Sequence, residues 1–120
     1  MPDPAPPQPI GFYRPAVRAG EWIVCSGQLG LHNGELVSGG VAAEVRQSVE
    51  NLATLLAAEG ASLRDVVKTT VFLTDMDRFA EMNDAYAAAF GDSRPARSAI
   101  GVVALPRGAA VEIEAWARLD

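Results

Sequence analysis

Several residue types are scarce in this chain of 120 residues, and each scarcity argues against a class of protein. The single cysteine, Cys25, excludes an intramolecular disulfide and favours a reducing compartment. The single histidine, His32, has no cysteine, histidine or aspartate at metal-ligand spacing, so we expect no metal site. Ten basic residues against 15 acidic ones give a net charge of −5, which disfavours nonspecific binding to nucleic acid or an anionic membrane.

Long hydrophobic runs are also missing. No apolar stretch approaches the roughly 20 residues of a membrane span. The N-terminal sequence MPDPAPPQPI has neither the basic region nor the apolar core of a signal peptide, so we expect a cytoplasmic protein. Hydrophobic residues make up 49% of the chain and charged residues 21%, which is typical of globular proteins. We expect residues 1–10 to form a proline-rich arm and residues 11–120 to form a single domain.

The pattern of apolar residues predicts strands and helices that alternate in the middle of the chain. A 3.6-residue period and a closing Gly60 indicate a helix over 41–59, and a second helix is expected over 76–90 after a capping aspartate. This order favours an α+β fold with both helices on one face of a sheet. Strands are expected at 12–18, at 22–26 with an end at Ser26-Gly27, and at 35–37, 66–73, 98–104 and 109–119.

The C-terminal stretch is interpreted as a hairpin, with LPRG (105–108) as its turn. Its last strand alternates, so that Glu112 and Glu114 lie on the face opposite to Val111 and Ile113. In such a hairpin Arg97 lies on the same face as Glu112, roughly 13 Å further along. The interpretation therefore predicts a guanidinium and a carboxylate on one sheet face, with room for a small anion between them.

Several stretches taken together resemble one protein family. They are CSGQLG (25–30), RQSVENL (46–52), DVVKTTVFLTDMDRFAEMNDAY (65–86) and PARSAIGVVALPRGAAVEIEA (95–115), and they closely resemble the Rid family of 2-iminopropanoate, or reactive-intermediate, deaminases. The resemblance implies a chorismate-mutase-like fold, in which a mixed sheet packs against two helices. It also implies a homotrimer with clefts between subunits. The implied reaction is hydrolysis of 2-imino and enamine acids to 2-oxo acids and ammonia, without cofactor or metal.

The resemblance also implies roles for individual residues. Arg97 is expected to bind the substrate carboxylate, which suits a guanidinium because its donors match a carboxylate in pairs and its charge is permanent. Glu112 is expected to hold or activate the attacking water. The implied substrate-binding residues are Tyr13, Ser26, Gly27, Asn83 and Arg97.

Other interpretations of these residues stay open on the sequence. Arg97 can form a surface ion pair, Tyr13 can be a packing residue, and Asn83 can form a bond within its helix. A regulatory protein that binds 2-oxo acids without turnover would use the same Arg97. A deaminase with another substrate would share the chemistry and differ in the pocket wall.

Overall fold

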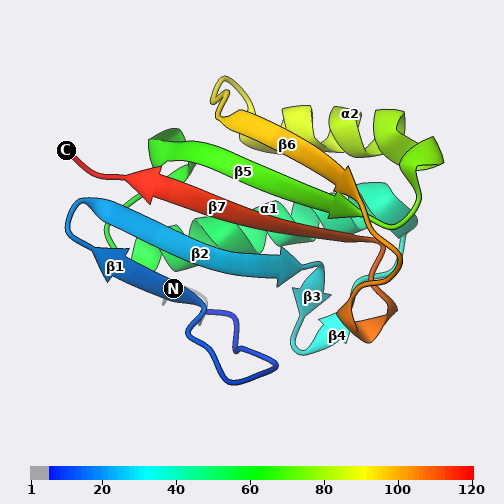
Figure 1. Cartoon of the computed structure of the whole chain (residues 1–120), viewed down its shortest axis with the longest axis horizontal. Coiled ribbons are helices and arrows are strands. Elements are labelled where there is room, and N and C mark those ends of the chain that lie inside the picture. The colour runs from blue at the N-terminus through cyan, green and yellow to red at the C-terminus, as the bar shows by residue number, and fades with distance from the viewer. Residues whose placement is uncertain (1–5) are drawn as a thin grey trace.

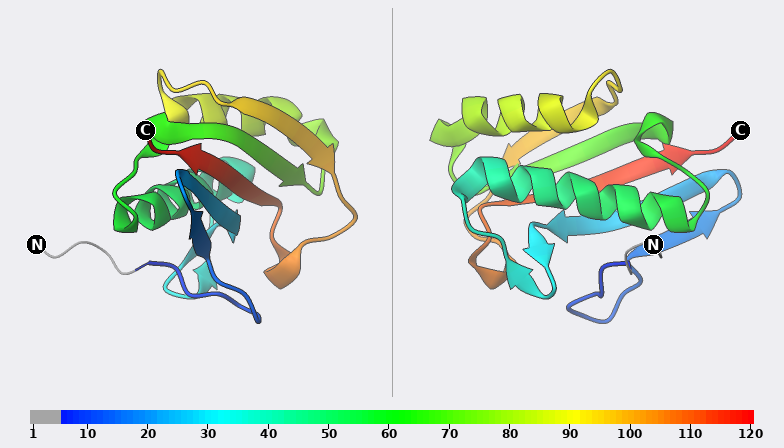
Figure 2. Two further views of the ribbon diagram at one scale, coloured as in Figure 1. Left: turned by 60° about the vertical axis from the view of Figure 1, so that its left-hand side comes forward. Right: turned by 180° about the vertical axis from the view of Figure 1, so that it is seen from behind.

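The computed structural model describes residues 6–120, which form two layers (Figures 1 and 2). Both helices lie on one face of a five-stranded mixed sheet, as the sequence predicts, and the other face is left open. Residues 1–5 of the expected proline-rich arm lie outside the described residues. Within residues 6–120, no helix combines the length and apolar character needed to cross a membrane.

The sheet has the strand order β1-β2-β7-β5-β6, and β3 and β4 form a separate short ribbon. All neighbouring strands are antiparallel except β5 and β6. The strands are β1 (Ala16–Ala19), β2 (Trp22–Leu29), β3 (Leu31–His32), β4 (Glu35–Leu36), β5 (Val66–Leu73), β6 (Ala96–Gly101) and β7 (Val111–Arg118). The helices are α1 (Gly40–Ala58) and α2 (Phe79–Phe90), with 3-10 turns η1 (Leu63–Asp65), η2 (Met76–Arg78) and η3 (Pro106–Gly108).

The helix predictions are confirmed within a few residues. The apolar stripe of α1 is buried, and α1 ends where Gly60 takes a φ of 77°. The Gly60 and Ala61 amides then donate to the Ala57 and Leu56 carbonyls, which satisfies the end of the helix. Asp75 caps η2 by accepting from the Asp77 amide at 3.0 Å, and α2 follows directly.

The predicted C-terminal hairpin is wrong. β7 lies between β2 and β5, and β6 pairs with β5 in parallel at the edge of the sheet (Figure 1). The reason is that β5, α2 and β6 form a crossover unit, which places β6 beside β5. Residues 102–110 then carry the chain past the end of β5 to the central position. The inner face of β7 is fully buried, as suits a central strand.

The boundaries of the N-terminal strands also differ from the prediction. β1 begins at Ala16 because residues 10–13 bend, and the short strand β3 was not expected. β2 does not end at Ser26-Gly27 but continues to Leu29. Its pairing with β7 shifts between Cys25 and Gln28, so Ser26 and Gly27 form a bulge inside the strand.

Two buried hydroxyl groups, those of Ser48 and Thr69, allow a stability test. The Ser48 hydroxyl on α1 is fully buried and has no hydrogen-bond partner among residues 6–120. The Thr69 hydroxyl on β5 is equally buried but bonds the Tyr86 hydroxyl at 2.7 Å. We expect Ser48→Ala to raise the free energy of unfolding by about 0.5–1.5 kcal/mol, because it removes an unpaired buried polar group and favours the helix.

Thr69→Val is the matched control, because it removes a paired hydroxyl at nearly constant volume. We expect it to lower the free energy of unfolding by about 1–3 kcal/mol. Urea denaturation followed by far-UV circular dichroism measures both values. Destabilisation by both variants would contradict the assignment of Ser48 as unpaired.

Candidate functional site

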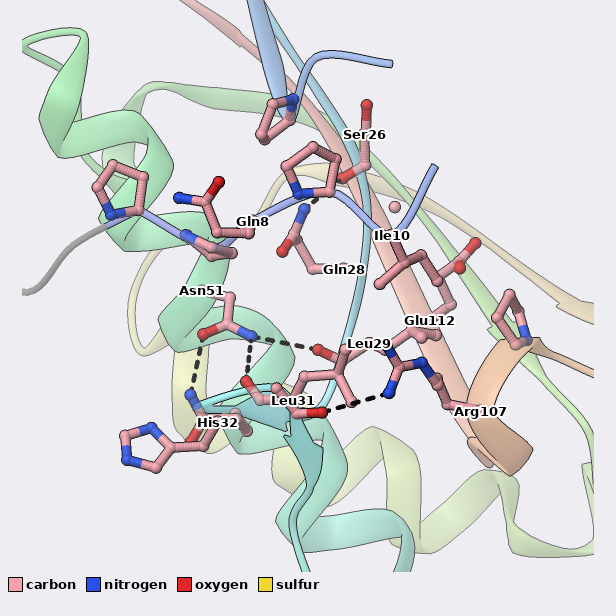
Figure 3. Close-up of a pocket in the computed structure, with 18 of the residues that line it drawn as sticks. Gln8, Ile10, Ser26, Gln28, Leu29, Leu31, His32, Asn51, Arg107 and Glu112 are labelled. Atoms are coloured by element: carbon pink, nitrogen blue, oxygen red, sulfur yellow. Dashed lines mark hydrogen bonds between the residues drawn. The ribbon is translucent and has the colours of Figure 1, made fainter. Parts of the chain in front are cut away.

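A large cavity opens where β2 meets the start of β7 (Figure 3). Its volume is about 1090 Å³, somewhat larger than the roughly 300–1,000 Å³ of pockets for drug-sized ligands. One wall comes from the bulge of β2 and from β7, and the others come from the N-terminal segment, the β3–β4 ribbon and α1. Among the lining residues are Tyr13, Ser26, Gly27, His32, Gln47, Glu50, Asn51, Arg107, Glu112 and Glu114.

Gly27 and Glu112 are in direct contact across the two strands. A methyl group at position 27 would lie 2.6 Å from Glu112 Oε2 and 2.9 Å from its Cγ, so only glycine leaves room for this carboxylate. The contact lies at the bulge of β2, next to the pairing of Leu29 with Glu112. The missing side chain at Gly27 thus lets Glu112 lie flat against β2 inside the cavity.

The Glu112 carboxyl has a raised pKa. Desolvation by burial is the main cause, and the negative charge of Glu114, two positions along the same face, adds to it. No ion pair to either carboxylate is present among residues 6–120. A carboxylate with a raised pKa is a better proton acceptor at neutral pH than an ordinary surface glutamate.

Ser26 of β2 holds the N-terminal segment in place, and Tyr13 forms a hydrogen bond within that segment. The Ser26 hydroxyl donates to the Arg14 carbonyl at 2.8 Å, and the Ser26 amide donates to the Pro15 carbonyl at 2.8 Å. The Tyr13 hydroxyl accepts from the Ile10 amide at 3.4 Å. The Ser26 hydroxyl proton is used by the Arg14 carbonyl, so the Ser26 oxygen can accept a hydrogen bond from a ligand. The Tyr13 oxygen accepts from Ile10, so the Tyr13 hydroxyl proton can be donated to a ligand.

Arg97 lies elsewhere. Arg97 pairs with Thr69 of β5, and Glu112 pairs with Phe72 of the same strand. Thr69 and Phe72 are three positions apart, so their side chains, and those of their partners Arg97 and Glu112, lie on opposite faces of the sheet. The prediction of both charges on one face is therefore wrong, because it depended on the hairpin. On the helix side, the Arg97 guanidinium lies 4.7 Å from the centre of the Tyr86 ring and 5.7 Å from that of Phe79.

Asn83 belongs to the Arg97 side of the molecule. It lies on α2 between Phe79 and Tyr86, at the three- and four-residue spacings that share one helical face. The pKa of Tyr86 is raised, mainly because the side chain is buried. The hydrogen bond with Thr69 and the positive charge of Arg97 lower this pKa but do not cancel the effect of burial. Of the predicted site residues, Tyr13, Ser26, Gly27 and Glu112 therefore line the cavity, while Arg97 and Asn83 do not.

Sequence reasoning missed Asn51 and Arg107. The Asn51 amide donates to the Leu31 carbonyl at 2.9 Å and the Leu29 carbonyl at 3.2 Å, and its oxygen accepts from Gln47. These bonds fix the cavity floor against α1 (Figure 3). Its position on the buried stripe of α1 was a usable signal, because a polar residue there needs internal partners. The sequence places Arg107 only in a predicted turn.

No cluster of three or more histidine, cysteine, aspartate or glutamate side chains in the described part of the chain has the arrangement of a metal site. Cys25 is buried in the hydrophobic core, and desolvation, with a smaller contribution from Glu59, raises its pKa to about 11. Such a thiol is unreactive at neutral pH.

The influence of Glu114 on Glu112 can be measured directly. We expect Glu114→Gln to lower the pKa of Glu112, because the substitution removes a negative charge that opposes ionisation. A ¹³C NMR titration of the Glu112 side-chain carboxyl reports this value. Glu35→Gln, on the exposed ribbon strand β4, is the control and should leave the titration unchanged. An unchanged or raised pKa in Glu114→Gln would contradict the assigned electrostatic coupling.

Comparison with known proteins places this geometry in a family. The family model described as endoribonuclease L-PSP matches residues 4–119. A RutC family protein of Pyrococcus horikoshii is 46% identical over 113 residues, which cover 92% of this chain and 90% of the relative. The 2-iminobutanoate/2-iminopropanoate deaminase of Mus musculus is 49% identical over 113 residues, covering 92% of this chain and 84% of the relative.

The solved structures agree with the sequence relatives. E. coli TdcF with bound serine superimposes with a TM-score of 0.90 at 35% identity, over 96% of this chain and 94% of TdcF. The match therefore extends over nearly the whole molecule. This chain belongs to the endoribonuclease L-PSP family, the Rid family that its sequence resembles.

Proposed function

We propose that this protein hydrolyses 2-imino and enamine acids to 2-oxo acids and ammonia, in clefts between the subunits of a homotrimer. The observation that carries the proposal is the Glu112 carboxylate, held on Gly27 inside the cavity with a raised pKa. The names of the mammalian relatives, which are 2-iminobutanoate/2-iminopropanoate deaminases, support the substrate class. The serine bound to TdcF supports a site for small α-carboxylates.

Hydrolysis of an imine needs a positioned substrate and a basic group beside a water molecule. In this proposal the Arg97 guanidinium binds the α-carboxylate through paired hydrogen bonds. The substrate reacts as its protonated iminium. Glu112 takes a proton from water while the water oxygen bonds to the iminium carbon, and the C=N π electrons move to the nitrogen. The resulting carbinolamine breaks its C–N bond when Glu112 returns that proton to the nitrogen. Ammonia leaves as the C–N bond breaks, and the remaining hydroxyl gives its proton to solvent or to the Glu112 carboxylate as the C=O bond of the 2-oxo acid forms.

The remaining predicted residues have roles that fit their contacts. The Tyr13 proton is available to the substrate or the leaving nitrogen, since the Tyr13 oxygen already accepts from Ile10. The Ser26 oxygen can accept from the attacking water or the nitrogen. Asn83 offers an amide near the carboxylate end, on the α2 face that supports Arg97. Gly27 contributes by its lack of a side chain.

The predicted site residues divide into two half-sites, with Tyr13, Ser26, Gly27 and Glu112 in one and Arg97 and Asn83 in the other, and this division supports the proposed trimer. Arg97 and Glu112 lie on opposite faces of one sheet, so a composite site needs the Arg97 side of one subunit against the Glu112 side of the next. Rotational symmetry with three subunits joins two different surfaces at every interface and produces three such sites. Exposed aromatic and aliphatic side chains on the open sheet face, including Trp22, Trp116 and Ile100, support an assembly that covers this face.

The proposed reaction can be tested by measuring turnover. An amino-acid oxidase generates 2-imino acids, and semicarbazide trapping measures how fast they disappear. We expect the wild-type protein to accelerate the loss of alkyl imines. Glu112→Gln should lower kcat/KM about 100-fold or more, because it removes the base. Arg97→Ala should lower it about 10- to 100-fold, because it removes charged hydrogen bonds to the carboxylate.

Glu35→Gln is the control for the loss of one carboxylate outside the cavity. Full activity in Glu112→Gln would exclude the proposed base. No acceleration by wild type, with 2-oxo acid binding that depends on Arg97, would instead identify a non-catalytic carboxylate-binding protein of the same fold.

The second prediction concerns the shared site. Arg97→Ala and Glu112→Gln subunits alone should each keep at most about a tenth of wild-type kcat/KM, but mixed trimers contain interfaces that pair an intact Arg97 with an intact Glu112. Random mixing in equal amounts should restore about a quarter of wild-type activity. An interface is active only when the subunit that supplies Arg97 is the Glu112→Gln variant and the subunit that supplies Glu112 is the Arg97→Ala variant, and each condition is met in half of the cases. The measurement is activity after joint refolding, with size-exclusion chromatography and light scattering to confirm the trimer. Absence of recovery in a verified mixed trimer would place both residues in one subunit's site.

A further inference from the structure

The cavity contains a cation that the proposed reaction does not use. Arg107 lies in η3 between the end of β6 and the start of β7, and its side chain lines the same cavity as Glu112 (Figure 3). Among the described residues, it is the one arginine that lines this cavity, and Arg97 does not. The guanidinium closest to Glu112 along the cavity wall is therefore not the one assigned to the α-carboxylate.

The backbone at Arg107 adopts a conformation that side chains rarely take. Its φ of 62° and ψ of 16° are left-handed, and Gly108 follows with a φ of 69°. A non-glycine residue keeps such a conformation when the surrounding structure holds it, and such residues concentrate at ligand sites. Here the conformation turns the guanidinium toward the β3–β4 ribbon and the cavity.

The Arg107 guanidinium has few partners within the chain. Its one hydrogen bond to the residues that the structure describes, from Nη1 to the Gly34 carbonyl, is long at 3.4 Å. None of the ion pairs formed by residues 6–120 involves it. Most of its five N–H donors are left for a ligand, and a guanidinium matches a carboxylate best.

The size and charge of the cavity restrict what that ligand group can be. A volume of about 1090 Å³ exceeds the need of a three- or four-carbon imino acid. The cavity also holds three carboxylates, Glu50, Glu112 and Glu114, together with His32. A negative ligand group is repelled from these carboxylates and stabilised at the Arg107 end, so Arg107 determines where such a group can bind.

We propose that Arg107 selects 2-imino acids whose side chain ends in a carboxylate and binds that terminal carboxylate at the rim of the Glu112 cavity. The inference rests on the proposed function, because the α-carboxylate of the same substrate is bound by Arg97. Two guanidinium groups then hold the two ends of a dicarboxylic substrate, with the imine carbon near Glu112. The favoured substrates are imines formed from acidic amino acids.

The test compares two imines of equal chain length. Amino-acid oxidases form one from glutamate, with a terminal carboxylate, and the other from norvaline, with a terminal methyl. The quantity measured is the ratio of kcat/KM for the two imines. We expect the ratio to exceed one for wild type and to fall about 10- to 100-fold in Arg107→Gln, the range expected for lost charged hydrogen bonds.

Arg46→Gln is the matched control. Arg46 lies exposed on α1, does not line the cavity, and its substitution changes the net charge by the same amount. We expect it to leave the ratio unchanged. Arg107→Lys should fall between wild type and Arg107→Gln, because lysine keeps the charge and loses the paired donors.

A binding measurement separates this inference from the proposed function. Calorimetry compares 2-oxoglutarate with 2-oxopentanoate, the corresponding products, and needs no turnover. Weaker selectivity for 2-oxoglutarate in Arg107→Gln supports the inference even if no imine is hydrolysed. Hydrolysis of both imines with a ratio at or below one in wild type, or an unchanged ratio in Arg107→Gln, overturns the inference and leaves the proposed function standing.

Discussion

The pairing of β7 with β2 on one edge and β5 on the other is the constraint on which the rest of the molecule depends. It places Ile113 and Ala115 on the fully buried face beneath the helices. The same register places Glu112 beside Leu29 of β2, at the cavity. Because β7 takes the central position, β6 is left at the edge, and residues 102–110 cross the end of the sheet with Arg107 among them.

Glycine makes the close contacts at the cavity possible. At Gly27 the Glu112 side chain occupies the space that a methyl group would need. At Gly30 a methyl group would lie 2.8 Å from the Glu44 Cα, so glycine also lets the end of β2 approach α1. The Glu44 carboxylate then accepts from the Ala110 amide at 2.8 Å and fixes the segment that enters β7. These contacts hold α1, the bulge of β2 and the central strand β7 together around the desolvated carboxylate of Glu112.

The separation of Arg97 from Glu112 has a physical meaning. Charges on opposite faces of a sheet lie on either side of its hydrogen-bonded backbone and cannot bind one small ligand together within one chain. Stacking on Tyr86 and Phe79 holds the Arg97 guanidinium in place at an edge strand. In the proposed trimer, a neighbouring subunit brings the second half-site, so catalysis depends on assembly. Subunit association and substrate binding would then stabilise the same interfaces.

The sequence by itself determined both helices and most of the strands, and it supplied the candidate site residues. Periodicity predicted α1, β5 and the alternation of β7, because burial of one face imposes a period of 3.6 or 2 on a single segment. The family stretches identified Arg97 and Glu112 as candidates, although their catalytic roles are still proposals. Tertiary structure decided strand order, the bulge at Ser26-Gly27, the faces of the two charges and the place of Arg107. These depend on which distant segments pair, and a local pattern cannot encode that choice, since Arg97 and Glu112 have the same alternation in a hairpin as in separate strands.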